Sequence, residues 1–185
     1  MLNKKEETHM ATIYIHNEEN TLLENEQEVR AYLEQQGVIY EHWDIEKLPK
    51  QLSEKYDLTD DEKEEILTVF QEEIKSISER RGYKAQDVIS LSDATPNLDE
   101  LLQNFKREHH HTDDEVRFIV SGHGIFAIQG KDGVFFDVRL NPGDLISVPP
   151  NIRHYFTLQE DRQVVAVRIF VTTEGWVPIY EEETV

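Results

Sequence analysis

The sequence contains no cysteine among its 185 residues. Disulfide bonds, thiolate metal ligands and cysteine nucleophiles are therefore all excluded. Basic residues are also scarce, because 19 Lys and Arg stand against 38 Asp and Glu and leave a formal net charge of -19. Such a charge repels both phosphate backbones and anionic lipid surfaces. The composition predicts a protein that binds neither nucleic acid nor membranes.

Long apolar runs are missing as well. No stretch reaches the roughly 18 to 20 apolar residues of a membrane span, and residues 1–10 lack the apolar core of a signal peptide. We expect a soluble, cytoplasmic protein whose residues 1–11 form a disordered tail. Apolar residues still make up 38% of the chain, which is enough to fill one core in a single domain. The high negative charge favours a monomer without requiring one.

Residues 12–105 alternate short β-rich runs with helical patterns. Runs rich in β-branched and aromatic residues at 12–16 and 38–43 predict strands. Between these runs, residues 26–36 predict a helix, because an Asn precedes them as N-cap and a Gly follows them. This part of the chain is expected to form an α/β decoration on the remainder.

The longest helix is predicted between Thr59 and Gly82. Thr59 and Glu62 have the spacing of a capping box, and glycine favours the C-terminal end of a helix. Apolar residues recur along the segment at three- and four-residue spacing, so one face should be buried. A further short helix is predicted to begin after Asn97 as its N-cap.

From residue 106 onward, the pattern changes to strands separated by tight turn signals. Six apolar runs follow one another at roughly eight- to twelve-residue spacing, which is typical of an antiparallel sandwich or barrel. Glycine and proline pairs, such as Pro142-Gly143, lie between them and suit tight turns. The sequence therefore predicts one mainly β domain over 1–185, with a metal-binding β-barrel core at 106–178.

Three consecutive histidines, His109, His110 and His111, open the β-rich half. On a strand, alternation places His109 and His111 on one face together with Glu115, and His110 on the other. Two imidazoles and a carboxylate on one face can bind a metal ion, whereas a solvated polar turn would need no ligand. His154 follows a proline-rich turn at the start of a later run, and in a closed barrel it can face the same interior.

These two segments resemble the paired motifs of the cupin superfamily. The first motif is matched in its ligand positions and closing glycine by His109-x-His111-x3-Glu115-x6-Gly122. The second is matched by Gly143-x5-Pro149-x4-His154. Asn151 and Leu158 depart from the usual second motif, but neither departure removes a ligand. Within the superfamily, EHHHTDDEVRFIVSG followed by VPPNIRHYFTL is similar to the acireductone dioxygenases, and the resemblance extends over residues 12–178.

The resemblance implies a jelly-roll barrel, also called a double-stranded β-helix, with N-terminal strands and helices. It implies one Fe(II) or Ni(II) per chain, bound by His109, His111, Glu115 and His154. Three imidazoles and one carboxylate suit either ion, and an octahedral ion would keep two positions open for a bidentate substrate. Because the same four side chains serve both metals, the sequence leaves the identity of the metal open.

The implied activity is that of a dioxygenase in the methionine salvage pathway. Its substrates are O2 and acireductone, 1,2-dihydroxy-3-keto-5-methylthiopentene. The iron form of the family yields formate and 4-methylthio-2-oxobutanoate, whereas the nickel form yields methylthiopropionate, formate and carbon monoxide. Chain-length tolerance for the substrate and regulation cannot be inferred from the sequence.

Two arginines are candidate catalytic residues. Arg117 lies two residues after Glu115 and shares its face, where a guanidinium would stabilise a dianionic substrate. It would equally serve as an ion-pair partner of Glu115 or Asp113. Arg168 interrupts the apolar run VVAVRIFV and requires either a partner or a polar cavity. The family resemblance implies that Arg168 lines the site, and a structural salt bridge fits its position as well.

Three aromatic residues are candidate walls of a pocket for the thioether chain of the substrate. Phe156 lies two residues after His154 on the same face, and Phe105 lies four residues before His109. Trp176 follows the last long apolar run. Apolar walls would exclude water from the site, although ordinary core aromatics would show the same pattern.

Two other functions are compatible with a cupin fold. A different metal-dependent cupin dioxygenase or isomerase would keep the four ligands but would not need Arg117 or a thioether pocket. A non-catalytic cupin that binds a small ligand would commonly have lost a metal ligand. The complete ligand set argues against the binding protein, and the DDEVRF context argues against the other enzymes.

The alternation of the histidine cluster predicts a contrast between neighbouring substitutions. His111→Ala should remove most of the affinity for a divalent metal, whereas His110→Ala should change it little, because His110 faces away from the other ligands. Titration of metal-free protein with Ni(II) measures both affinities. A comparable loss in the two variants would contradict the alternation argument.

Overall fold

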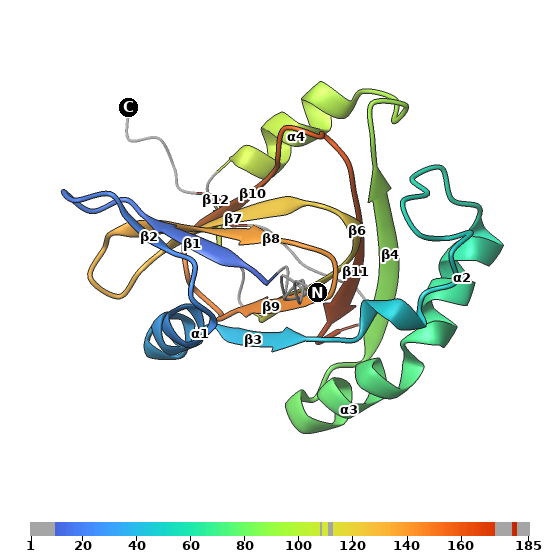
Figure 1. Ribbon diagram of the computed structural model, residues 1–185, viewed down its shortest axis with the longest axis horizontal. Helices are drawn as coiled ribbons and strands as arrows, with labels where there is room; N and C mark the ends of the chain where they lie inside the picture. The colour runs from blue at the N-terminus through green and yellow to red at the C-terminus, as the bar shows by residue number, and fades with distance from the viewer. Residues whose placement is uncertain (1–9, 108, 111–112, 173–178, 181–185) are drawn as a thin grey trace, which may run out of the picture.

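Two antiparallel sheets face each other and form the centre of the molecule (Figure 1). The computed structural model describes residues 10–107, 109–110, 113–172 and 179–180. The larger sheet has the strand order β12 (Ile179–Tyr180), β5 (His109–His110), β10 (His154–Leu158), β7 (Gly124–Gln129), β8 (Phe135–Leu140), β1 (Thr12–Ile15), β2 (Thr21–Leu23). The smaller sheet has the order β3 (Ile39–His42), β9 (Asp144–Val148), β6 (Glu115–Gly122), β11 (Val164–Phe170), β4 (Ala85–Leu91). The mainly β architecture predicted from the sequence is confirmed.

The N-terminal part of the chain contributes strands to both sheets. β1 pairs with β8, β3 pairs with β9, and β4 pairs with β11. β1 and β3 occupy the two β-rich runs that predicted strands. β2 and β4 were not predicted, because TLL and AQDVISL show no sustained alternation of apolar and polar residues. β4 forms the edge of the smaller sheet beside β11.

The helices lie on the outside of the sheets (Figure 1). They are α1 (Glu26–Gln35), the short 3-10 helix η1 (Ile45–Lys47), α2 (Asp60–Val69), α3 (Gln71–Arg81) and α4 (Leu98–Lys106). α2 and α3 cover the outer side of the smaller sheet near β4, and α4 contacts β10. None of the helices in the described ranges is long and apolar enough to cross a membrane.

The predicted single helix between Thr59 and Gly82 is wrong in one respect, because the structure divides it into α2 and α3 at Phe70. Phe70 leaves the helical conformation at φ -102 and ψ 16, is fully buried, and packs edge-on against Phe118 at 4.8 Å between ring centroids. The predicted ends are confirmed: Thr59 forms the capping box, and Gly82 adopts a φ of 77 at the C-cap.

Other predicted caps differ in their details. Asn25 accepts hydrogen bonds from the backbone N–H groups of Gln27 and Glu28 and so caps α1 as expected. Asn97 precedes α4, but it adopts a φ of 58 and makes no side-chain cap bond. Asparagine tolerates this left-handed conformation better than most residues do, which accounts for its place in the turn.

The smaller sheet is buried on both faces. Val164 and Ala166 of β11 pack in the core between the sheets, whereas Val165 and Val167 pack against the helical layer. β6 alternates in the same way over its first five residues, so that the odd-numbered residues from 115 to 119 face the interior of the barrel. Burial on both faces explains why these strands read as continuous apolar runs. Charged residues at interior positions therefore need specific partners.

Gly122, the last residue of β6, is packed closely against the backbone of a neighbouring segment. Its φ is 71, and a β-carbon would lie 2.1 Å from the carbonyl oxygen of Gln163. Gly122→Ala should lower the free energy of unfolding by about 2–5 kcal/mol, from backbone strain and overpacking together. Urea unfolding measures the change.

Gly133 is the matched control for this substitution. Its φ is 83, but a β-carbon there would meet no atom within 4 Å. Gly133→Ala should therefore cost only the left-handed backbone strain of about 1–2 kcal/mol. Equal losses in the two variants would show that the contact with Gln163 contributes nothing.

Candidate metal centre

Glu115 and His154 approach each other from opposite sheets. Glu115 is the first residue of β6 in the smaller sheet, and His154 is the first residue of β10 in the larger sheet. Their side chains are only 3% and 1% exposed, and Nε2 of His154 contacts Oε2 of Glu115. The fold thus brings together two predicted ligands that lie 39 residues apart in the sequence.

The predicted histidine cluster lies beside this pair, although much of it falls outside the described residues. β5 pairs with β10 so that His109 stands opposite His154 in the backbone register. The side chains of His109 and His110, and all of His111, are not described. Among the residues that the structure does describe, no group of three potential ligands occurs. The backbone therefore places three of the four predicted ligand positions next to one another.

Strand alternation does not connect Glu115 with the histidines. β5 belongs to the larger sheet and β6 to the smaller one, so the chain passes from one sheet to the other between His110 and Glu115. The prediction that a single strand carries all three side chains is therefore wrong for Glu115. Glu115 meets His154 because the sheets face each other across the barrel, which a period-two pattern along one strand cannot reveal.

The hydrogen bonding of His154 directs Nε2 of its ring toward the Glu115 carboxylate. Nδ1 of His154 lies 2.7 Å from the carbonyl oxygen of Ile152, which can only accept, so Nδ1 carries the hydrogen. In the neutral ring, Nε2 then presents a lone pair toward a carboxylate oxygen, which is a second acceptor. Two acceptors so close together are favourable only with a shared proton, or with a cation that binds both of them. A backbone carbonyl that fixes the imidazole tautomer is typical of metal-binding histidines, so the residues fit a divalent ion.

Arg117 occupies the interior next to Glu115. Its side chain is 4% exposed, and its Nη2 lies 3.4 Å from Oε1 of Glu115. The guanidinium carbon lies 4.2 Å from the ring centroid of Phe156 and 5.4 Å from that of Phe126. Burial lowers the pKa of Arg117 to about 10, so the side chain stays charged at neutral pH. The sequence left Glu115 and Asp113 open as ion-pair partners of Arg117, and the structure shows the pair with Glu115.

Arg168 lies directly opposite Arg117 in the register of β11 and β6. Its side chain pairs with Asp87 of β4 through two bonds, from Nε to Oδ1 at 2.7 Å and from Nη2 to Oδ2 at 2.5 Å. Asp87, Arg168 and Arg117 therefore form a row across three neighbouring strands. The structure thus contains the salt bridge that the sequence left open for Arg168, on the same face of the sheet as Arg117.

Of the three predicted pocket aromatics, the structure places the side chain of one. Phe156 is 2% exposed and stacks against Phe126 at 5.0 Å between ring centroids, next to Arg117. Phe105 lies in α4, which contacts β10, but its side chain is not described. Trp176 lies outside the described residues. Phe126 was not predicted as a pocket residue, although the alternation of the run GIFAIQ is compatible with an inward-facing side chain at this position.

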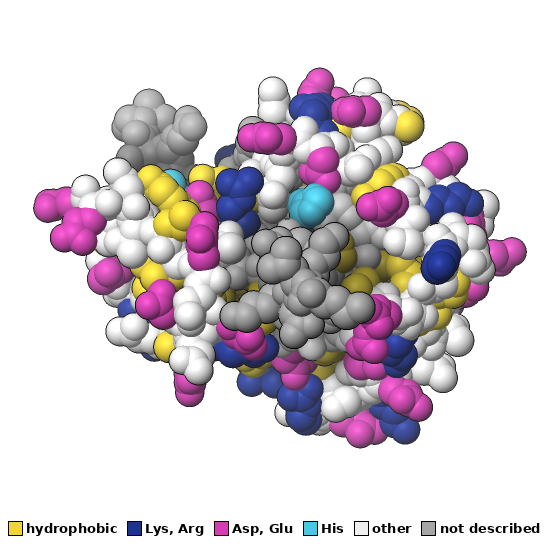
Figure 2. Space-filling view, viewed as in Figure 1, with side chains coloured by type: hydrophobic (Ala, Val, Ile, Leu, Met, Phe, Trp, Pro, Cys, Tyr) yellow, Lys and Arg dark blue, Asp and Glu magenta, His cyan; other side chains and the backbone are white. Residues whose placement is uncertain are grey.

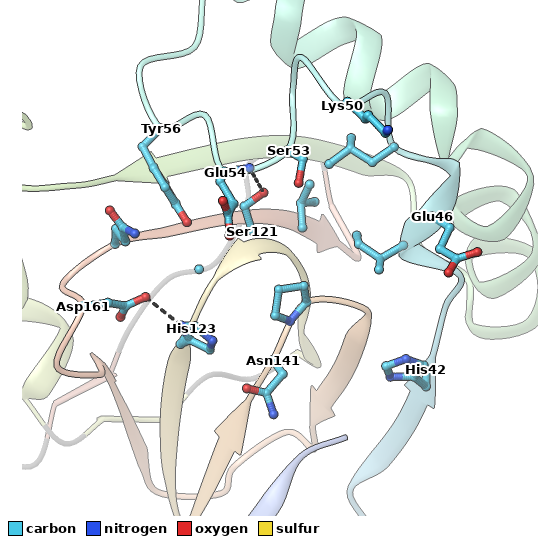
Figure 3. A pocket seen from close by; sticks show the side chains of 16 residues that line it. His42, Glu46, Lys50, Ser53, Glu54, Tyr56, Ser121, His123, Asn141 and Asp161 are labelled. Atoms are coloured by element: carbon cyan, nitrogen blue, oxygen red, sulfur yellow. Dashed lines mark hydrogen bonds and ion pairs between the residues drawn. The ribbon is translucent and has the colours of Figure 1, made fainter. Parts of the chain in front are cut away.

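The other described histidines are paired with aspartates away from Glu115. His16 contacts Asp137 at 2.9 Å, and His42 contacts Asp144 at 3.0 Å. His123 contacts Asp161 at 2.6 Å. His42 and His123 line a cavity of about 810 Å³ (Figure 3). Neither Glu115 nor His154 lines this cavity, so it is separate from the candidate metal centre.

Comparison with known proteins agrees with this geometry. The model of the ARD/ARD' family matches residues 12–178. The chain belongs to this family. The acireductone dioxygenase of Bacillus pumilus (strain SAFR-032) is 90% identical and covers 95% of this chain and 100% of its own. That of Bacillus subtilis (strain 168) is 77% identical, with 95% and 99% covered.

A solved structure is similar over nearly the whole chain. It is described as acireductone dioxygenase from Bacillus anthracis with cadmium ion in active center. Its sequence is 72% identical, its TM-score is 0.90, and the match covers 92% of this chain and 98% of that chain. The predicted family and the predicted cupin fold are both confirmed.

Proposed function

We propose that the chain is a metal-dependent dioxygenase that cleaves acireductone with O2. The contact between Glu115 and His154 supports this proposal most directly, because two buried acceptors at this position fit a metal ion. The two Bacillus relatives described above, both named acireductone dioxygenase, are 90% and 77% identical over 95% of the chain. The products follow the branches of the family: formate with 4-methylthio-2-oxobutanoate, or methylthiopropionate, formate and carbon monoxide.

The proposed ligand set is His109, His111, Glu115 and His154, with one Fe(II) or Ni(II) per chain. The facing positions of His109 and His154 and the buried contact of Glu115 with His154 support it. The relative from Bacillus anthracis carries a metal ion in its active centre, which agrees with such a site. A bound divalent ion would supply a Lewis acid and a template for a bidentate enediolate.

The chain's own residues would bind and orient the substrate next to the ligands. Arg117 is charged, buried and held against the ring of Phe156, so it can stabilise the negative charge of an enediolate without rearrangement. Exclusion of water strengthens this attraction. Phe156 supplies an apolar wall for the thioether chain, and we assign the same role to Phe105 and Trp176. Arg168, anchored by Asp87, lies beside Arg117 on the same face of the sheet, and we assign it a role in lining the site.

We also infer a cytoplasmic monomer that forms one domain over 1–185, with the barrel core at 106–178. The absence of cysteine and the net charge of -19 support this view. Figure 2 shows Asp and Glu side chains distributed around the described part of the visible face, with Lys and Arg side chains interspersed among them. Such a surface favours a small substrate over nucleic acid or a membrane.

Oxygen uptake by the reconstituted enzyme tests the proposed function. Metal-free protein is loaded separately with Fe(II) and Ni(II) and given acireductone, while O2 is followed and the products are identified. Rapid uptake with metal-dependent products is expected. Tight metal binding without uptake under either metal would retain the metal centre but reject the dioxygenase in favour of another cupin activity.

Arg117→Met tests the role of the buried arginine. The substitution fills the space between the rings but removes the charge, so kcat/KM should fall by about 10²- to 10³-fold. The metal-loaded enzyme is used, because the ion offsets the charge of Glu115. Arg162→Met is the matched control, since Arg162 pairs with Asp93 and Asp99 at the surface. Unchanged kcat/KM in Arg117→Met would leave Arg117 as a structural partner of Glu115 only.

A further inference from the structure

The residue that precedes Glu115 is attached to the helical layer. Asp114 is half-buried, with 13% of its side chain exposed, and its Oδ2 accepts two hydrogen bonds. The hydroxyl of Tyr83 donates one at 2.8 Å, and Nη2 of Arg81 donates the other at 2.9 Å. These contacts join the junction of α3 and β4 to the start of β6. We propose that Tyr83 and Arg81 are positioning residues for the metal centre, acting through Asp114 on Glu115.

The junction that carries these donors is itself held firmly. Gly82 ends α3 with a φ of 77, and the backbone N–H groups of Gly82 and Tyr83 both donate to the carbonyl oxygen of Ser78, at 2.8 and 3.0 Å. The N–H of Lys84 then donates to Phe170 at the end of β11, at 2.8 Å. The backbone that carries Tyr83 is thus held on both sides of this residue.

Tyr83 also remains a hydrogen-bond donor over the working range of pH. Its side chain is 6% exposed, and burial raises the pKa of its hydroxyl. The same hydroxyl lies 3.4 Å from Oγ of Ser147 in β9, which pairs with β6. Tyr83 therefore links the helix end, Asp114 and the neighbouring strand at one point.

The contacts of Tyr83 and Arg81 with Asp114, which we call the clamp, lie directly before Glu115 at the start of β6. The ladder between β6 and β9 starts with the pair Glu115 and Val148, so few sheet contacts hold the backbone of Glu115 on its N-terminal side. Asp114 and Glu115 are consecutive, and their side chains point in opposite directions, one toward the helices and one toward His154. Fixing Asp114 from outside therefore fixes the direction in which the Glu115 carboxylate enters the barrel. Metal–ligand distances lie within about 0.2 Å of their typical values, so affinity should be sensitive to this anchor.

This inference rests on the proposed metal centre, and its test uses metal affinity alone. Full-length metal-free protein is titrated with Ni(II) by calorimetry. Tyr83→Phe keeps the buried ring and removes only the hydroxyl, so its dissociation constant for Ni(II) should rise by about three- to tenfold. Asp114→Asn, which removes the charge that Arg81 and Tyr83 both contact, should raise it further.

Tyr40→Phe provides the matched control. The Tyr40 hydroxyl donates at 2.5 Å to Asp144, a fully buried carboxylate at the far end of β9. This variant also loses one hydroxyl from a carboxylate, but it leaves the start of β6 untouched, so its Ni(II) affinity should equal that of the wild type. Thermal unfolding of both variants shows whether their stability losses are comparable.

Two results would overturn the inference: unchanged Ni(II) affinity in Tyr83→Phe, or an equal loss in Tyr40→Phe. In the second case general destabilisation would explain the effect. Wild-type protein that bound no Ni(II) or Fe(II) would overturn the metal centre and the clamp together. Wild-type protein that bound metal but consumed no O2 would overturn the proposed function alone. The clamp would still be supported by the Ni(II) affinities measured for the variants.

Discussion

The burial of charged groups between the two sheets is the constraint on which the site depends. Glu115, His154 and Arg117 are each almost fully removed from water, and such burial is costly unless every charge has a partner. Residues of both sheets supply these partners. Oε1 of Glu115 faces Arg117 and Oε2 faces His154, while the carbonyl of Ile152 fixes the imidazole. A metal ion bound by Glu115 and His154 would likewise offset the negative charge of the Glu115 carboxylate.

A row of three charged residues crosses the smaller sheet beside Glu115. Arg117 lies beside Arg168, and Asp87 on the edge strand β4 offsets the second positive charge. Two adjacent guanidinium groups inside a barrel would repel each other without such a carboxylate. Phe156 and Phe126 hold Arg117 by cation–π contacts in addition to its ion pair, which fixes the direction of the guanidinium.

The helical layer therefore does more than cover an apolar face. Phe70, at the break between α2 and α3, packs this layer onto Phe118 of the smaller sheet. At the C-terminal end of α3, the layer changes from apolar packing to the polar contact with Asp114. In this way a part of the chain that contributes no proposed metal ligand reaches the residue next to Glu115.

The sequence by itself determined the mainly β architecture, the helix ends at Thr59 and Gly82, and the residue types proposed for the candidate metal centre. These features depend on local patterns: capping spacings, runs of apolar residues, and donor side chains at fixed intervals. Only the tertiary structure decided that Glu115 and the histidines come from different sheets. It also decided that β4 brings Asp87 to Arg168, and that Tyr83 reaches Asp114. Such contacts join residues more than thirty positions apart, and a local period carries no information about them because they depend on how the sheets and helices pack.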